Sequence, residues 1–392
     1  MIRIRLRNKT EYSRLRQEYL KLMVKYVGFD ESDILNDDTK SSTKRKTTET
    51  AKILRKRYPE LYNFLFQDKE LNKVNRENLK MLLVGPEKMP ASFGGKGDCF
   101  PTMNDFLIWL RQQCMPQNQS EAKAVCKTIF RYKNGFGKSQ DAYRLLRSLN
   151  VHVCPYCNRI YTITLPSKQE LAPGHRFRPT RPTFDHFYSQ DECPFLALSL
   201  FNLVPSCHIC NGNKHATRTE LVYPYDEAFE KKAVFRVIPK IDALAHENGN
   251  PFSFLIGESD SFYIKFMGNE CISLLENTPL SYRLSDIKDE TYRKRIENSI
   301  QVFSLEEQYC EHNSEIRDIL RNHYYFNENY IRSVLCPMIQ EKMSKEGHGV
   351  ISQEQIMVMA MDMIYFSRIC QDEWGERPLS KLTADILEQV SV

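Results

Sequence analysis

The sequence of 392 residues lacks long hydrophobic runs, internal repeats and long low-complexity tracts. Its longest apolar stretches, such as residues 356–361, fall far short of the roughly 18 residues that a membrane span needs. Residues 1–7 carry positive charge but neither an apolar core nor a small-residue cleavage site, so a secretory signal is not expected. These absences argue against a membrane protein and lead us to expect a protein of the cytoplasm, where disulfide frameworks are rare.

Familiar nucleotide-binding and nucleic-acid-binding signatures are also missing. The glycine-rich stretch at 89–97 resembles a phosphate cradle, but no Gly-Lys-Ser/Thr follows it, so we interpret it as an ordinary turn. The chain contains no sequence pattern typical of a zinc finger or of an RNA-recognition motif. Any function must therefore be found in less common patterns.

Charge is distributed unevenly along the chain, although the net charge is only +5. Residues 1–150 contain 30 Lys and Arg against 17 Asp and Glu, whereas residues 251–392 contain 14 against 23. The basic front could bind a nucleic-acid backbone, most densely at 44–46 and 52–57, although such helical faces are commonly only solvated. The acidic back is a poor nucleic-acid surface and suits a protein partner better.

Hydrophobic periodicity predicts an α+β protein that is mostly helical, in three regions. Residues 1–149 form a basic helical region, with helices expected at about 10–27, 48–66, 69–84, 103–114, 119–132 and 138–148. Residues 150–220 lose this periodicity and contain short strand-like runs such as 160–165. Residues 221–392 are mixed and then helical, with strands expected at 233–238 and 262–266 and helices at about 286–302, 305–320, 325–344, 352–370 and 379–390.

Cysteine is concentrated in the middle region. Five of the twelve cysteines fall between residues 154 and 210, and four of them form two Cys-x-x-Cys pairs, Cys154 with Cys157 and Cys207 with Cys210. Four thiolates from two tight turns are the ligand set of a closed tetrahedral Zn²⁺ site. One pair alone would also fit a redox motif, and unligated core thiols are the alternative for both. Cys193 has no nearby partner and is not expected to be a ligand.

Polar residues suited to phosphate chemistry stand between and directly after the two pairs. Asp185 and His186 occupy a strand-like segment, Asn202 follows, and Asn211 comes directly after the last cysteine. Carboxylate and amide oxygens are hard ligands suited to Mg²⁺. A neighbouring imidazole can deprotonate water. A lone Asp-His pair is usually an ordinary polar pair, but this setting favours a one-metal phosphodiesterase site.

These residues resemble a known family. The pattern Cys-x-x-Cys, Asp-His, Asn-Leu-x-Pro-x-Cys-x-x-Cys-Asn-x-x-Lys, at 154–157, 185–186 and 202–214, is similar to that of the HNH endonucleases. The strings at 154–159, 223–226 and 377–382 (Cys-Pro-Tyr-Cys-Asn-Arg, Tyr-Pro-Tyr-Asp and Arg-Pro-Leu-Ser-Lys-Leu) are similar to those of the HNH subunit of Septu-type bacterial anti-phage systems, which also accompanies some retrons. The resemblance covers about 70 residues of the core and weakens towards residue 392, while residues 1–140 resemble no family.

The resemblance implies a ββα-metal core stapled by zinc. In it, His186 would be the general base that activates water, Asp185 a ligand of a catalytic Mg²⁺ or Mn²⁺, and Asn202 the brace of the hairpin that orients His186. The family often has His where this chain has Asn211, whose amide oxygen suits Mg²⁺ and disfavours softer metals. The metal would hold a phosphate oxygen and stabilise the departing 3′ oxygen, leaving 5′-phosphate ends.

Several basic residues near this core are candidates for substrate contact. Lys214 and, less directly, Arg159 are placed to contact a backbone phosphate, and His215 has either such a contact or no role. His208 is expected to be exposed, because four cysteines already satisfy zinc. A Pro-rich loop before the Asp-His pair carries three arginines that form either a phosphate-guiding rim or a solvated loop: Arg176, Arg178 and Arg181.

The resemblance thus implies an endonuclease that acts in anti-phage defence, in a hetero-oligomeric complex with an SMC-like, ABC-type ATPase. The acidic region 251–392 would dock that partner. DNA is the expected substrate. An RNA nuclease, for example one that cuts tRNA, is one alternative, because the site contacts phosphate rather than sugar. A zinc-stapled module that binds nucleic acid or protein without chemistry is the other.

Overall fold

The computed structural model describes residues 1–6, 8–35, 45–68, 72–95, 100–165, 180–240, 253–270, 278–345, 351–366 and 370–390. Within these ranges the chain is mostly helical and contains three antiparallel two-stranded sheets. The expected mostly helical α+β class is confirmed at this level. None of the described helices combines the length and the apolar character that crossing a membrane would require.

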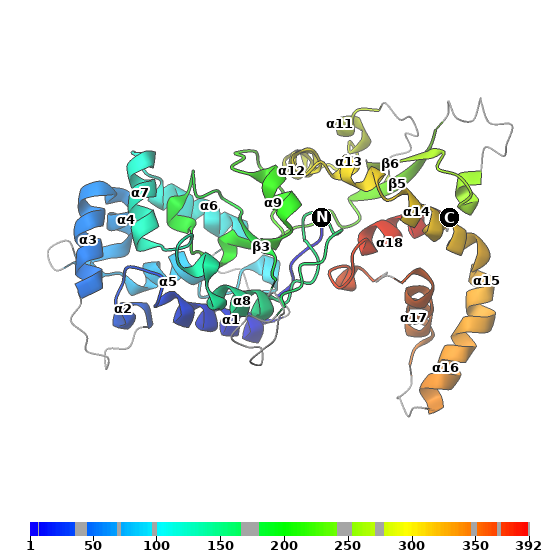
Figure 1. Cartoon of the computed structure of the whole chain (residues 1–392), viewed down its shortest axis with the longest axis horizontal. Helices are drawn as coiled ribbons and strands as arrows, with labels where there is room; N and C mark the ends of the chain where they lie inside the picture. Colours follow the sequence, from blue (N-terminus) through cyan, green and yellow to red (C-terminus); the bar gives the residue numbers. More distant parts are fainter. Residues whose placement is uncertain are drawn as a thin grey trace, which may run out of the picture.

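The first region is a helical body on one side of the molecule (Figure 1). Its elements are α1 (Lys9–Met23), α2 (Glu31–Leu35), α3 (Arg45–Arg57), α4 (Pro59–Leu65), β1 (Phe66–Asp68), β2 (Lys73–Val74), α5 (Arg76–Val84), α6 (Met103–Cys114), α7 (Gln119–Ile129) and α8 (Gln140–Leu149). Apolar residues at helical spacing drive this packing, since α1 buries Tyr12, Leu15, Tyr19 and Met23 on one face.

The single helix expected at 48–66 is in fact two helices, and proline is the reason. A residue that precedes proline is disfavoured in the α conformation, and Tyr58 has φ −154° and ψ 70°. Helix α3 therefore ends at Arg57, and Pro59 begins α4 at a position where its missing N–H costs nothing.

The middle of the molecule contains a short β-hairpin followed by a helix. Strand β3 (Thr183–His186) pairs with β4 (Leu203–Ser206), so that Asp185 lies opposite Val204 and His186 opposite Leu203. Helix α9 (His208–Lys214) begins directly after β4 and packs against β3. The strand-like run expected at 160–165 forms only an isolated bridge, between Val153 and Tyr161.

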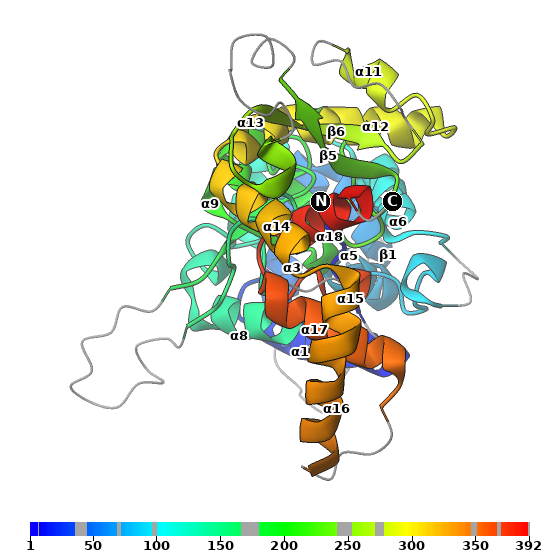
Figure 2. The same cartoon turned by 90° about the vertical axis from the view of Figure 1, so that its right-hand side faces the viewer.

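The last region lies on the opposite side from α1–α7 and combines a β-ribbon with helices (Figure 1). Its elements are β5 (Ala233–Pro239), β6 (Phe262–Gly268), α11 (Leu280–Arg283), α12 (Glu290–Val302), α13 (Leu305–Cys310), α14 (Asn313–Tyr325), α15 (Glu328–Tyr330), α16 (Cys336–Lys345), α17 (Gln353–Tyr365) and α18 (Ser380–Val390). The two expected strands are confirmed. Helices α15, α16 and α17 project away from the rest in Figure 1, and α16 extends beyond the rest in Figure 2 as well.

The buried apolar side chains of all three regions belong to one continuous core. Residues of the Tyr-Pro-Tyr-Asp string connect the regions: the Tyr223 and Tyr225 hydroxyls donate to the Phe201 and Leu203 carbonyls beside β4. The neighbouring Asp226 carboxylate accepts the Met103 backbone N–H at the start of α6. The hairpin is thereby held between the two helical sides.

Candidate functional site

The four cysteines of the two Cys-x-x-Cys pairs come together in one buried cluster. Their sulfur atoms all lie within 4.8 Å of one another, and the Cys157 and Cys207 sulfurs are 4.0 Å apart. Tetrahedral zinc with Zn–S bonds near 2.3 Å places its sulfurs about 3.8 Å apart. Cys154, Cys157, Cys207 and Cys210 therefore fit a metal ion such as zinc, which would hold the two turns together.

The backbone around the cluster also favours thiolates. The N–H groups of Arg159 and Cys210 donate to the Cys157 and Cys207 sulfurs, at 3.5 and 3.4 Å. The N–H group of Cys207 likewise donates to the Cys154 sulfur at 3.4 Å. The expected exposure of His208 is confirmed, and His208 is not part of the cluster.

Asp185 is buried and both of its carboxylate oxygens have protein partners. The Lys214 ammonium donates to Oδ1 at 3.1 Å, and the Tyr156 hydroxyl donates to Oδ2 at 2.6 Å. The side chains of Asp185 and Lys214 are only 4% and 1% exposed. An acid with two donors and a positive charge against it is a satisfied structural group.

This arrangement does not fit the expected catalytic Mg²⁺ or Mn²⁺ at Asp185 and Asn211. A divalent cation at Asp185 would have to displace the Lys214 ammonium or stand beside it, and like charges at such a distance repel strongly. Asn211 lies partly exposed on α9, and its side chain makes no hydrogen bond with the described residues. Within those residues, the cysteine cluster is the one group of three or more His, Cys, Asp or Glu that could hold a metal ion.

His186 ends β3 and lies at the edge of the site, partly exposed. Its Nε2 is 3.0 Å from the Ala197 carbonyl oxygen, and the Gln190 amide nitrogen lies within 3.1 Å of both ring nitrogens. A proton on Nε2 satisfies the carbonyl and leaves Nδ1 as the basic nitrogen. Burial lowers the pKa of the imidazole to about 4, so that the ring is neutral at pH 7.

Asn202 fixes the loop that follows His186. Its side-chain oxygen accepts the Tyr188 N–H at 2.8 Å, while its amide donates to the Tyr188 and Leu196 carbonyls at 3.0 and 3.2 Å. The backbone N–H of Phe187 also donates to the Asn202 carbonyl. Asn202 is fully buried, so these bonds bind the chain leaving β3 to the chain entering β4.

Two of the three residues expected to contact substrate, Lys214 and Arg159, are placed differently from that expectation. Lys214 forms a buried ion pair with Asp185, so its ammonium group does not face solvent, as a contact with phosphate would require. Arg159 donates to His312 at 2.8 Å and to Gln308, which fixes it against the C-terminal helices. His215 is exposed at the end of α9, and its side chain has no hydrogen bond or ion pair with the described residues.

Of the three arginines in the Pro-rich loop, only Arg181 lies within the described residues. Arg176 and Arg178 lie outside the described residues. Arg181 donates to the Gly137 and Pro182 carbonyls, so its guanidinium joins the entry of β3 to the turn before α8.

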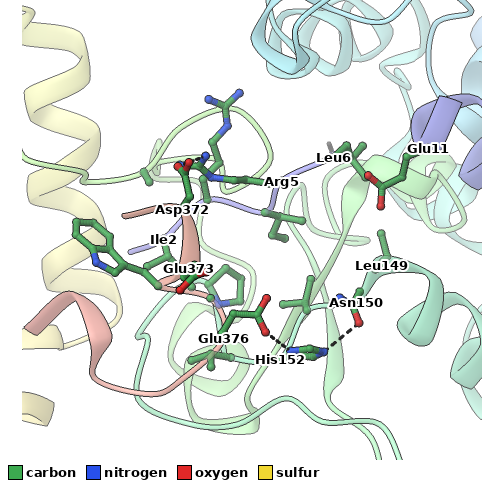
Figure 3. Close-up of a pocket in the computed structure, with 18 of the residues that line it drawn as sticks. Ile2, Arg5, Leu6, Glu11, Leu149, Asn150, His152, Asp372, Glu373 and Glu376 are labelled. Carbon is green, nitrogen blue, oxygen red and sulfur yellow. Dashed lines mark hydrogen bonds and ion pairs between the residues drawn. The ribbon is translucent and has the colours of Figure 1, made fainter. Parts of the chain in front are cut away.

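A cavity of about 880 Å³ lies elsewhere, where the first residues of the chain meet the end of α8 and residues 371–376 (Figure 3). It carries opposite charges, with Arg5 paired to Asp372 and the His152 ring between Glu376 at 2.9 Å and Asn150 at 3.0 Å. None of the site residues expected from the sequence lines it.

Two site residues were not identified from the sequence. Tyr156 stands between two zinc-type cysteines, where its buried hydroxyl reaches Asp185. Tyr132 belongs to the first region, and its ring lies edge-on to the His186 ring at 4.4 Å between centroids. No local signal marks Tyr132, because the contact spans 54 residues of chain.

Comparison of the chain with protein-family models, with curated proteins and with solved structures finds no match.

Proposed function

We propose that this chain is an HNH-type endonuclease that hydrolyses nucleic-acid phosphodiester bonds with His186 as general base. The observation that carries the proposal is the arrangement of the hairpin β3–β4 and helix α9 beside a four-cysteine cluster, with a neutral histidine at the end of β3. The order of these residues along the chain also resembles that family.

In the proposed reaction the Gln190 amide, which lies 3.1 Å from Nδ1 of His186, gives way to a water molecule, and Nδ1 takes a proton from that water. The water oxygen then attacks phosphorus, the bond from phosphorus to the 3′ oxygen breaks, and this oxygen takes up a proton from solvent. The products are a strand that ends in a 3′ hydroxyl and a strand that begins with a 5′ phosphate. The Ala197 carbonyl and the loop held by Asn202 orient the imidazole for this transfer. No step is assigned to a catalytic metal, because Asp185 is already occupied by Lys214 and Tyr156.

DNA is the proposed substrate and RNA the first alternative. We also propose, from the family resemblance, that the protein is the effector of an anti-phage system and acts with an SMC-like ATPase. The acidic region 251–392 is the part of the chain suited to dock such a partner.

One observation favours a second candidate, a zinc-stapled binding module without chemistry. Asp185, Tyr156 and Lys214 satisfy one another completely, as residues that only stabilise a fold would do. This candidate leaves the neutral, partly exposed His186 without a role.

Cleavage assays on plasmid DNA and on structured RNA separate these functions. The assays would contain Mg²⁺, Mn²⁺ or no added divalent cation, each with and without ATP and the co-purified products of neighbouring genes. We expect DNA cleavage that His186→Ala abolishes and that His208→Ala, a matched loss of an exposed imidazole in α9, leaves intact. Equal cleavage by wild type and His186→Ala would remove the proposed base, and binding without cleavage in every condition would favour the second candidate.

A further inference from the structure

The turn between α7 and α8, residues 131–138, forms one side of the His186 site although it belongs to the basic helical region. The Tyr132 ring lies 4.4 Å from the His186 ring between centroids, with the two planes at 83°. This contact places the turn next to the proposed base, where an attacked phosphate would have to lie.

The turn is held rigidly in this position. The Phe136 and Gly137 N–H groups donate back to the Arg131 and Tyr132 carbonyls at 2.9 and 2.8 Å. A Cβ at Gly137 would come within 3.2 Å of the Tyr132 ring, so glycine permits the close approach of backbone and ring. Arg181 donates to the Gly137 carbonyl and thereby ties the turn to β3.

Tyr132 brings an unused hydrogen-bond donor to the site. Its ring is partly exposed, and its hydroxyl makes no hydrogen bond with the residues that the structure describes. Burial raises the pKa of Tyr132 to about 12, so the phenol keeps its proton at neutral pH. A protonated phenol beside the base is a suitable donor to a phosphate oxygen.

Two lysines follow Tyr132 along the same turn. Lys133 and Lys138 are exposed, and neither makes an ion pair with any described residue. The nearest acid along the chain, Asp141, is already paired with Lys25 and Arg144. Two unpaired lysines on the same turn as the phenol carry the charge that a phosphate backbone attracts.

We propose that turn 131–138 is the phosphate-binding wall of the His186 site. In this proposal, Tyr132 donates to an oxygen of the phosphate under attack, while Lys133 and Lys138 contact the neighbouring phosphates. The proposal rests on the proposed nuclease function and narrows its substrate class to strands with phosphates on both sides of the cut, which excludes mononucleotides.

The lysines are tested by binding, which needs no cleavage. In a His186→Ala background, affinity for a fluorescent DNA duplex is measured at several salt concentrations. Lys133→Ala with Lys138→Ala should lower the slope of log affinity against log salt by about 1.8, since each phosphate contact contributes roughly 0.9. The matched control Lys342→Ala with Lys345→Ala removes the same charge from exposed positions of α16 and should leave the slope unchanged. An unchanged slope in the Lys133 and Lys138 double variant would contradict the proposal that this turn binds phosphates.

The phenol is tested by cleavage. Tyr132→Phe keeps the ring against His186 and should lower kcat about 10- to 100-fold, the effect of losing one hydrogen bond to a charged group, with little change in affinity. If Tyr132→Phe is fully active while His186→Ala is inactive, the proposed role of the Tyr132 hydroxyl is refuted. The proposal that the protein is a nuclease would still stand. If no variant cleaves any substrate, the nuclease proposal fails, and the salt slope still decides whether the turn binds phosphates.

Discussion

The pair of Asp185 and Lys214 determines what the centre of the site can do. Both side chains are almost fully removed from water, and the Lys214 ammonium also donates to the His186 carbonyl at 2.8 Å. Lys214 therefore holds the backbone at His186, the proposed base. It also neutralises Asp185, the only buried acid in the described strands β3 and β4. A buried pair of this kind is costly to break from one side, because the remaining charge has no solvent.

Replacing Lys214 by methionine should destabilise the protein by about 3–5 kcal/mol, because Asp185 would remain as a buried and uncompensated charge. Chemical denaturation monitored in the hairpin region measures this loss. The double variant Lys214→Met with Asp185→Asn should recover much of the stability, since it removes both charges. A loss below about 1 kcal/mol in the single variant would show that the pair is solvated, as surface pairs are.

Replacing Tyr156 by phenylalanine should lower the free energy of unfolding by about 1–3 kcal/mol. The Tyr156 hydroxyl is the only donor to Asp185 Oδ2 among the described residues, and the variant leaves this buried oxygen without a partner. Tyr161→Phe is the matched control, since Tyr161 lies in the same segment and is 52% exposed. The same denaturation measurement applies to both variants. Equal stability of the two variants would contradict the hydrogen bond seen at Tyr156.

The residue pattern predicted the cysteine cluster but not the partners of Asp185. Two Cys-x-x-Cys pairs in one region are local turns whose four thiols together suit a metal ion, so their spacing was sufficient to predict the cluster. The role of Lys214 was predicted wrongly because a lysine at the end of a short helix is usually exposed. Its burial depends on how α9 packs on β3, which no local pattern encodes.

At the scale of elements, hydrophobic periodicity predicted most of the helices, and proline accounts for places where the helices of the structure depart from that prediction. The single helix expected at 325–344 contains a π-helical turn at Ile331–Leu335, directly before Pro337. Proline has no N–H for the carbonyl four residues earlier and crowds it. The helix widens there, and the Cys336 N–H donates to Ile331, five residues back. Periodicity alone does not reveal such local changes.

The start of α6 depends on an acid from another region, which gives a prediction for this element. Asp226 accepts the Met103 and Asn104 N–H groups at 3.0 and 2.6 Å, where a helix has unsatisfied donors. Asp226→Ala should cost about 1–2 kcal/mol and speed hydrogen exchange in the first turn of α6. Glu220→Ala, a loss of an exposed acid, should change neither. Unchanged exchange in α6 would show that Asp226 does not stabilise this helix start, where Thr102 is the N-cap residue.

At the scale of the whole molecule, the first cysteine pair is where the terminal regions meet. The Ile2 N–H donates to the Pro155 carbonyl, and the Tyr309 hydroxyl donates to the Cys157 carbonyl at 2.6 Å. Asn158, with a left-handed φ of 54°, donates to the Trp374 carbonyl and accepts the Lys381 N–H. The string at 377–382 thus contacts Asn158, the residue directly after Cys157, so that loss of a metal ion from the cysteine cluster should affect more than the hairpin.

Removal of zinc is therefore predicted to loosen the molecule on both sides of the cluster, because knuckle folding is coupled to metal binding. Hydrogen exchange followed by mass spectrometry should show faster exchange in residues 151–165 and 180–214 after chelation, and also in α13 and α18, which contact the first pair directly or through Asn158. Helices α3 and α4, which lie far from α9 in Figure 1, should change least. Cys207→Ser should reproduce this pattern and lose the metal. Cys193→Ser, at an equally buried cysteine outside the cluster, should keep both metal and protection. Full protection of 151–165 in a protein shown to be free of zinc would rule out the four-cysteine site as a folding element.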